Sequence, residues 1–206
     1  MYLAYSPFWL RCLYRKLTWH KSRKEKYIYL TFDDGPIPVV TPWVLNILKK
    51  FNIKATFFCI GENVSKHPEI YQRILADGHS VGNHTYNHLK GWETTDEEYL
   101  NNIEKCAEVV HSQLFRPPYG RAKTSQYSIL NTQYSIIMWD VLSGDFDSDL
   151  SPEACLKNVL KYTRKGSIIV FHDSLKAFER LEYALPLSLE WLQKKGYNFL
   201  PLQPNN

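Results

Sequence analysis

The chain lacks any apolar run of the ~20 residues that a membrane-spanning helix needs. It also lacks the features of a signal peptide. No cation precedes its first apolar run, Pro7 interrupts that run, Arg11 ends it, and no small-residue cleavage site follows. These absences favour a cytoplasmic location, with the option of a membrane surface if the N-terminal segment binds lipid.

Cysteine is scarce and widely spaced. The four cysteines form no metal-type pair, so we expect reduced and mostly buried thiols at Cys12, Cys59, Cys106 and Cys155. The sequence also has no internal repeat, low-complexity tract or linker. A length of 206 residues therefore indicates one well-buried domain.

Negative charge is almost absent from the first 26 residues, which hold seven of the 25 basic residues and only one of the 21 acids, Glu25. The rest of the chain has 18 basic and 20 acidic residues, so the net charge of +4 does not indicate a nucleic-acid binder. We divide the chain into a basic, aromatic N-terminal arm (1–26) and a single domain (27–206). The arm either packs on the domain with its charges in solvent or lies on an anionic membrane surface.

Short apolar runs alternate with longer amphipathic ones along the domain. We predict strands near Tyr27–Phe32, Ala55–Cys59, Ser80–Gly82, Leu114–Arg116, Ser135–Trp139, Ser167–Phe171 and Asn198–Pro201. We predict helices over about Pro42–Phe51 and Pro68–Ala76, from Thr95, near Lys123–Leu130, from Ser151 and over roughly Phe178–Lys195. Seven strands that alternate with helices indicate an α/β fold with a parallel sheet, either open or closed into a barrel.

Polar residues that can carry chemistry follow the predicted strands. In such folds functional groups gather at the carboxyl ends of the strands, so we expect these residues on one face. They are Asp33 and Asp34 after the first strand, His84 and His88 after the third, Arg116 and Tyr119 after the fourth, Asp140 and Asp145 after the fifth, and His172 and Asp173 after the sixth.

Asp33 and Asp34 are adjacent like charges, which need a compensating cation if the fold places them side by side. One can bind a metal while the other acts as a base, although a simple Asp-Gly turn is the alternative. His84 and His88 are spaced i and i+4, so on a helical turn both imidazoles chelate one ion. Two His with one Asp suit zinc, and also iron, cobalt or nickel.

His172 follows an apolar strand and is either a satisfied core histidine or a general acid or base. Arg116 precedes two prolines and is either a surface residue at a turn or a guanidinium that holds a catalytic carboxylate ionised. The remaining histidines have no comparable context and are expected to be structural or surface residues: His20, His67, His79 and His111.

Five motifs, in this order, resemble those of the polysaccharide deacetylase family, the NodB-homology or family 4 carbohydrate esterases. The resemblance covers about residues 26–202. The motifs are Thr31-Phe32-Asp33-Asp34-Gly35-Pro36, the 55–63 stretch Ala-Thr-Phe-Phe-Cys-Ile-Gly-Glu-Asn, His84-Thr85-Tyr86-Asn87-His88, Arg116-Pro117-Pro118-Tyr119-Gly120 and Val170-Phe171-His172. The resemblance implies a distorted, TIM-barrel-like (β/α) barrel with about seven parallel strands.

The resemblance also implies roles for single residues. Asp34, His84 and His88 would hold a divalent metal, with zinc expected first and cobalt, nickel or iron as alternatives. Asp33 would be the general base and His172 the general acid, with Arg116 beside the base. The Tyr119 N–H would stabilise the oxyanion. Residues expected to line the substrate pocket are Tyr119, Trp139, Phe146 and Val170.

A further motif of the family, in which two aspartates are followed by Trp, is altered here in the stretch Leu142-Ser143-Gly144-Asp145-Phe146. Leu142 stands in place of the acid that orients the catalytic histidine in relatives, and Phe146 stands in place of the Trp. Val170 replaces a Leu of the acetyl pocket. The partner of His172 is therefore open, and Asp140 and Asp145 are the two candidates.

We expect a metal-dependent hydrolase that removes N-acetyl groups from an N-acetylated glycan or amino sugar. Two alternatives remain: a deacylase of a non-sugar amide or of an O-acetylated polymer, and a catalytically impaired glycan-binding module. The expected partner is a carbohydrate and not nucleic acid, and the sequence gives no oligomeric state.

Overall fold

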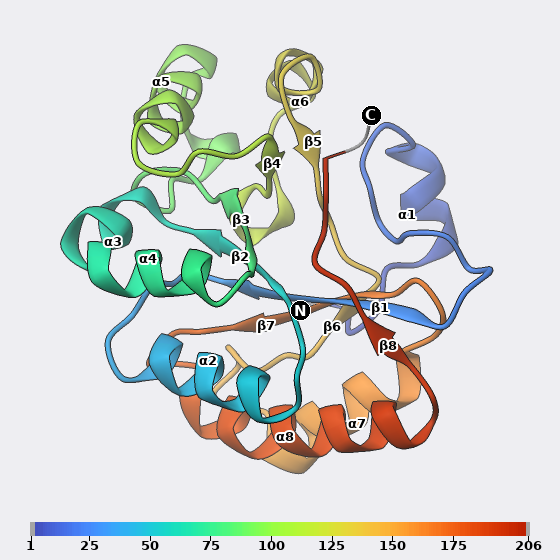
Figure 1. Ribbon diagram of the computed structural model, residues 1–206. Coiled ribbons are helices and arrows are strands. Elements are labelled where there is room, and N and C mark those ends of the chain that lie inside the picture. Colours follow the sequence, from blue (N-terminus) through green and yellow to red (C-terminus); the bar gives the residue numbers. More distant parts are fainter. Residues whose placement is uncertain (1–2, 205–206) are drawn as a thin grey trace.

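The computed structural model describes residues 3–204, in which strands and helices alternate (Figure 1). The strands are β1 (Tyr27–Asp33), β2 (Thr56–Cys59), β3 (Ser80–Asn83), β4 (Leu114–Phe115), β5 (Ser135–Ile136), β6 (Val141–Leu142), β7 (Ile168–His172) and β8 (Asn198–Phe199). The α-helices are α1 (Phe8–Leu13), α2 (Val40–Lys50), α3 (Gly61–Lys66), α4 (Pro68–Ala76), α5 (Asp96–Ala107), α6 (Thr124–Leu130), α7 (Pro152–Tyr162) and α8 (Phe178–Lys194). Two 3₁₀ turns follow β3 and β4: η1 (Gly91–Glu93) and η2 (Pro118–Gly120).

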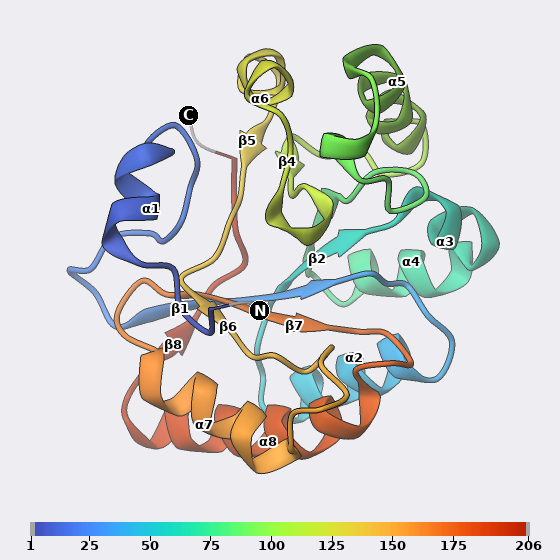
Figure 2. The same ribbon diagram turned by 180° about the vertical axis from the view of Figure 1, so that it is seen from behind.

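The strands form one curled sheet in the order β5-β4-β3-β2-β1-β7-β6, and β8 pairs with the start of β1 outside this path. Every strand pair is parallel. Helices cover its outer side, and α1 lies on the side of the molecule away from α3 and α4 (Figures 1 and 2). The predicted distorted (β/α) barrel is confirmed.

One predicted strand is only partly confirmed. Of the expected strand Ser135–Trp139 only Ser135–Ile136 (β5) is a strand; β6, which was not predicted, follows it and lies at the opposite edge of the sheet. The residues between them cross from one edge to the other. The Ile137 N–H still donates to the Phe115 carbonyl of β4, but the carbonyl oxygens of Ile137 and Met138 accept hydrogen bonds from the buried guanidinium of Arg116. A tertiary contact thus interrupts the apolar run.

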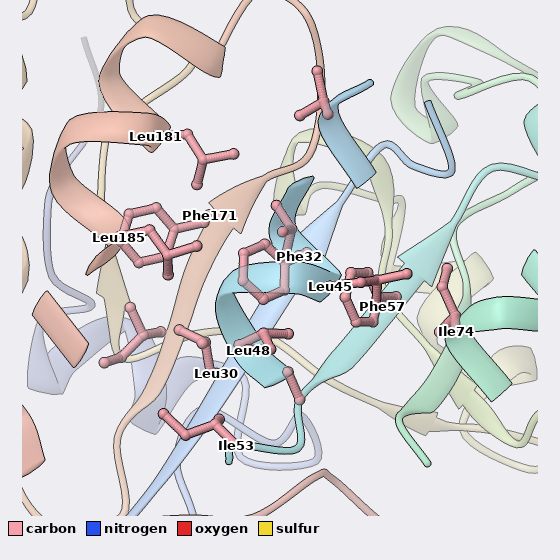
Figure 3. Packing of buried hydrophobic residues seen from close by; sticks show 14 of the residues in the cluster. Leu30, Phe32, Leu45, Leu48, Ile53, Phe57, Ile74, Phe171, Leu181 and Leu185 are labelled. Carbon is pink, nitrogen blue, oxygen red and sulfur yellow. The ribbon is translucent and has the colours of Figure 1, made fainter. Parts of the chain in front are cut away.

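Side-chain alternation along β1 separates the core from the site. Ile28, Leu30 and Phe32 point outward into a large apolar core, whereas the intervening Thr31 and Asp33 point inward and bond to Arg116. Figure 3 shows Phe32 among the outer core residues, and its ring stacks on Phe57 at a centroid distance of 5.0 Å. Removing such a buried aromatic side chain costs about 3–5 kcal/mol, so the outer core fixes β1 and with it the position of Asp33.

Two predicted helix starts are confirmed by their caps. The Thr95 hydroxyl accepts a hydrogen bond from the Glu98 N–H, and the Ser151 hydroxyl accepts one from the Ala154 N–H. The sequence prediction missed α1 and α3, which have six residues each. Neither is long enough to give a periodic pattern that can be distinguished from a loop.

The N-terminal arm packs on the barrel and pairs with both edges of the open sheet. The Thr18 N–H donates to the Ile136 carbonyl at one edge, and the Leu142 N–H donates to the Ala4 carbonyl at the other. Trp19 is 6% exposed and joins the core under α5 and α6. The arm therefore covers backbone groups that an open sheet would leave exposed at its edges. Among residues 3–204, no helix is both long and apolar enough to cross a membrane.

Candidate active site

Asp33 and Asp34 end β1 and point in different directions. Asp33 continues the inward face of the strand, whereas Asp34 has a left-handed backbone with φ of 82°. Asp33 Oδ1 lies 2.6 Å from Arg116 Nη1. Asp34 Oδ1 lies 3.3 Å from His88 Nε2 and 3.7 Å from His84 Nε2. The two adjacent carboxylates thus face two different environments.

His84 and His88 converge on Asp34 from a loop, so the predicted helical turn is wrong. Residues 84–90 form neither helix nor strand, and His88 has a φ of 60°. Side chains hold this loop: Asn83 Oδ1 accepts from the Thr85 N–H, and Asn102 Oδ1 accepts from the Tyr86 N–H. The loop, and not helical periodicity, brings the two imidazoles together.

Asp34, His84 and His88 fit a divalent metal ion. One ligand atom from each lies within 4.8 Å of the others. Asp34 Oδ1 is buried and has no hydrogen-bond partner among the described residues, so a cation is the partner that it lacks. His84 Nδ1 donates to the Arg116 carbonyl at 2.8 Å, which leaves the lone pair of Nε2 free to bind a metal. Burial lowers the pKa of His84 well below its ordinary value. A neutral His84 can therefore bind metal.

Arg116 is fully buried and organises the base side of the site. Its guanidinium donates to Asp33 and to Thr31 Oγ1 as well as to two backbone carbonyls, and it lies over the Phe58 ring at 4.1 Å. Burial raises the pKa of Asp33, and the charges of Arg116 and His172 limit this rise. The predicted contact between Arg116 and a carboxylate is confirmed.

His172 ends β7 on the same inner face, and Asp145 is its partner. Asp145 Oδ1 lies 2.7 Å from His172 Nδ1, and Oδ2 accepts the His172 backbone N–H, also at 2.7 Å. Burial acts to lower the pKa of His172, but the Asp145 carboxylate outweighs it and raises this pKa to about 9. His172 is therefore protonated near neutral pH.

Asp140 lies at the opposite end of the barrel, so its expected place beside His172 is wrong. It precedes β6, and its carboxylate accepts from Ser167, which precedes β7. Arg23 Nη2 donates to it at 2.9 Å, and Arg11 and Arg164 lie within 3.6 Å. Burial acts to raise the pKa of Asp140, but the Ser167 hydrogen bond, with Arg23 and Arg164, lowers it. Asp140 ties the N-terminal arm to the barrel.

The four expected pocket residues lie around these groups. Tyr119 is 55% exposed, has a φ of 58°, and its ring centroid lies 4.7 Å from that of His88. Trp139 packs beneath the turn at Gly120, where a Cβ would come within 2.3 Å of its ring. The Phe146 ring lies 5.1 Å from His172. Val170 is on the inner face of β7 but fully buried, so its contact with substrate stays a prediction.

Asp173 supports the turn after β1, a role that the sequence did not reveal. Its carboxylate accepts from the Gly35 N–H at 3.1 Å and from the Thr41 hydroxyl at 2.5 Å. Gly35 has to be glycine here because a Cβ would collide with this carboxylate. Burial raises the pKa of Asp173 to about 8. Asn63 Nδ2 donates to the Asp34 carbonyl at 2.8 Å and fixes the same turn from the other side.

Backbone strain is concentrated in this region. Of the six non-glycine residues with positive φ in the described chain, four belong to the site: Asp34, Thr85, His88 and Tyr119. Each such conformation costs about 1–3 kcal/mol and persists where the surroundings impose it. Strain at a metal triad and at an adjacent turn is typical of a preorganised functional site.

Known proteins carry the same arrangement of sequence and fold. The polysaccharide deacetylase family matches residues 20–134. A peptidoglycan-N-acetylglucosamine deacetylase of Bacillus cereus is 35% identical over 191 residues, which cover 89% of this chain and 90% of that protein. A crystal structure of a peptidoglycan N-acetylglucosamine deacetylase superposes with a TM-score of 0.88 at 32% identity and covers 96% of this chain and 95% of the other. A family 4 pseudoenzyme from Bacillus anthracis superposes with a TM-score of 0.77 at 26% identity, with 88% and 65% covered.

Proposed function

This chain belongs to the polysaccharide deacetylase family, and from that premise we propose that it is a metal-dependent hydrolase that removes N-acetyl groups from an N-acetylated glycan or amino sugar. The observation that carries the proposal is the divergence of the two adjacent aspartates. Asp34 faces His84 and His88, and Asp33 faces Arg116. A ligand and a free base thus stand side by side, as hydrolysis of an amide requires.

Asp34, His84 and His88 would hold a divalent ion. When bound, such an ion would supply polarisation of the acyl carbonyl and a pKa of the attacking water lowered toward ~7. Two imidazoles and one carboxylate suit zinc first, and cobalt, nickel and iron are the alternatives.

Asp33 acts as the general base. Arg116 occupies its Oδ1, which leaves Oδ2 to take a proton from the attacking water. The raised pKa that burial gives this carboxylate makes it a stronger base than a solvated aspartate.

His172 acts as the general acid. Its Nδ1 is committed to Asp145, so Nε2 carries the proton for the departing amine. A pKa of about 9 keeps that proton in place at neutral pH. On the other side of the site, the backbone N–H of Tyr119 stabilises the negative oxygen that develops on the acyl carbon.

Acetate release tests the proposal. The protein, stripped of metal and then reloaded with zinc, cobalt or nickel, is assayed on peptidoglycan fragments, chitooligosaccharides and acetylated xylan. We expect metal-dependent release from at least one of the N-acetylated substrates. Release from xylan alone would make the protein an O-deacetylase. Tight glycan binding without any release would instead support a catalytically impaired binding module; one relative is a pseudoenzyme.

A further inference from the structure

Large apolar side chains are exposed in one part of the N-terminal arm. Thirteen large hydrophobic residues of the described chain are exposed, and five of them lie between residues 3 and 13. We call these five the α1 patch: Leu3, Tyr5, Phe8, Trp9 and Leu13. Phe8 is 74% exposed, Trp9 63% and Leu13 68%. A soluble monomer rarely leaves so many apolar side chains together in water, and such patches mark interaction sites.

The polarity of α1 is inverted relative to an ordinary surface helix. At 100° per residue, Phe8, Trp9 and Leu13 share one side with Cys12, and all four are apolar. The inward side carries Leu10, which packs on the core under α5 and α6, and a cation: Arg11 Nη1 lies 3.6 Å from the buried carboxylate of Asp140. The helix therefore presents its apolar side outward while a salt bridge fixes the other side to the barrel.

Cations flank the patch on two sides. Arg15 and Lys16 follow α1 directly and are exposed. On the other side Tyr5 stacks on Tyr162 at 4.9 Å, and Lys161 Nζ lies 4.9 Å from the Tyr162 ring.

A hollow of about 560 Å³ opens beside α1. Four of the nine described residues that line it are Arg or Lys, and none of the nine is acidic; the four are Arg11, Arg15, Lys21 and Arg23. Asp140 pairs with Arg11 and Arg23, so the hollow carries less charge than its four cations but stays positive next to the apolar side of the helix.

We propose that residues 3–23 form a peripheral membrane-binding surface for an anionic phospholipid bilayer. The α1 patch enters the boundary between headgroups and acyl chains, with α1 parallel to the membrane plane, and the hollow beside it receives lipid phosphate. A second copy of this chain fits less well, because a symmetric contact through the patch would bring Arg15 and Lys16 of both copies together. Apolar contact and charge act jointly, so binding is reversible and weakens with salt.

Vesicle flotation of the full chain tests this. We expect the protein to float with phosphatidylglycerol vesicles at low salt and to stay behind with pure phosphatidylcholine vesicles. The triple variant Phe8→Ser, Trp9→Ser and Leu13→Ser removes the three most exposed side chains of the α1 patch. It is expected to weaken vesicle binding by at least ~100-fold, since each side chain contributes apolar area to insertion.

Charge reversal of Arg15→Glu with Lys16→Glu is expected to weaken binding by at least ~10-fold and to reduce its salt dependence. Two matched controls should bind like the wild type. The first control replaces three exposed apolar residues outside the arm: Leu75→Ser with Ile129→Ser and Leu187→Ser. The second control replaces two exposed cations on α2: Lys49→Glu with Lys50→Glu.

Circular dichroism of every variant verifies the fold. Three results overturn the proposal: no binding by the wild type, full binding by either arm variant, or an equal loss in the controls. A wild-type dimer that ignores vesicles, and that the triple arm variant converts to monomer in sedimentation, also overturns it and assigns the patch to a second copy.

Discussion

Asp145→Asn isolates the charge that controls the proposed general acid. His172 is pulled in two directions: burial favours the neutral ring, and Asp145 favours the charged one and raises the pKa to about 9. Asparagine keeps the shape and one acceptor oxygen for Nδ1 but removes the charge. Burial is then opposed only by the charges of Asp34 and Asp33, so the pKa of His172 is expected to fall toward its ordinary 6.5.

The expected effect on rate depends on pH. The proposed acid works only when protonated, so activity is lost as pH rises through the pKa of His172. At pH 7.5 the protonated fraction falls from about 97% at a pKa of 9 to about 9% if the pKa reaches 6.5. We therefore expect kcat at pH 7.5 to fall by up to ~10-fold, with a smaller loss near pH 5.5.

Two measurements test this. The pH profile of acetate release by the metal-loaded enzyme should show its alkaline limb moved down, by up to ~2 pH units, in the variant. An NMR titration of the His172 ring in metal-free protein measures the same pKa without catalysis.

Asp140→Asn is the matched control, because Asp140 is also a buried acid with several partners but lies at the other end of the barrel. The Asp140→Asn variant is expected to lose stability but to keep the alkaline limb of the pH profile where it is in the wild type. An alkaline limb that does not move in Asp145→Asn, or that moves equally in Asp140→Asn, would refute the reasoning.

Three further substitutions separate the roles at the site. Asp33→Asn should keep the metal and lower kcat by ~10²–10⁴ because it removes the base and not a ligand; wild-type turnover would contradict this. His84→Ala should show no bound metal in elemental analysis, and full occupancy in this variant would refute the ligand set. His79→Ala is the control and should keep the metal, since His79 Nδ1 accepts a backbone N–H from Ala55 instead. Arg116→Met should lower the free energy of unfolding by about 3–5 kcal/mol at pH 7, because the buried Asp33 carboxylate loses its cation. The loss should be smaller at pH 5, because burial already raises the pKa of Asp33 and protonation then removes the unpaired charge. Equal losses at both pH values would argue against the pairing.

Long periodic segments of the fold were predictable, and short ones were not. Pro68–Ala76 was predicted residue for residue, since its apolar spacing and its Asp-Gly stop are local signals. The two-residue strands β5 and β6 give no such signal. Their separation depends on Arg116, which lies about 20 positions away in the sequence and takes the backbone carbonyls between them. Local sequence carries no trace of that contact.

The site shows the same division. The principal groups were predictable because they directly follow apolar strands, and parallel strands bring their carboxyl ends together. The supporting side chains, Asn83, Asn102 and Thr41, were missed. They are common polar residues whose role depends only on which loop they reach. Asp140 was misplaced because β6 is too short to reveal that it begins after Asp140 and ends before Asp145.

The apolar residue at position 142 is compatible with acid catalysis because one carboxylate meets both needs of His172. Asp145 bonds the ring through Oδ1 and the backbone through Oδ2, which fixes the position and the tautomer of the imidazole together. Asp145 is itself held, since its carbonyl accepts from Arg180 Nε at 2.7 Å and its N–H donates to Ser143 Oγ. A second acid at position 142 would add a like charge near Asp145 inside the barrel and would need a further cation. Asp145 alone can therefore orient the proposed proton donor with an apolar residue at position 142.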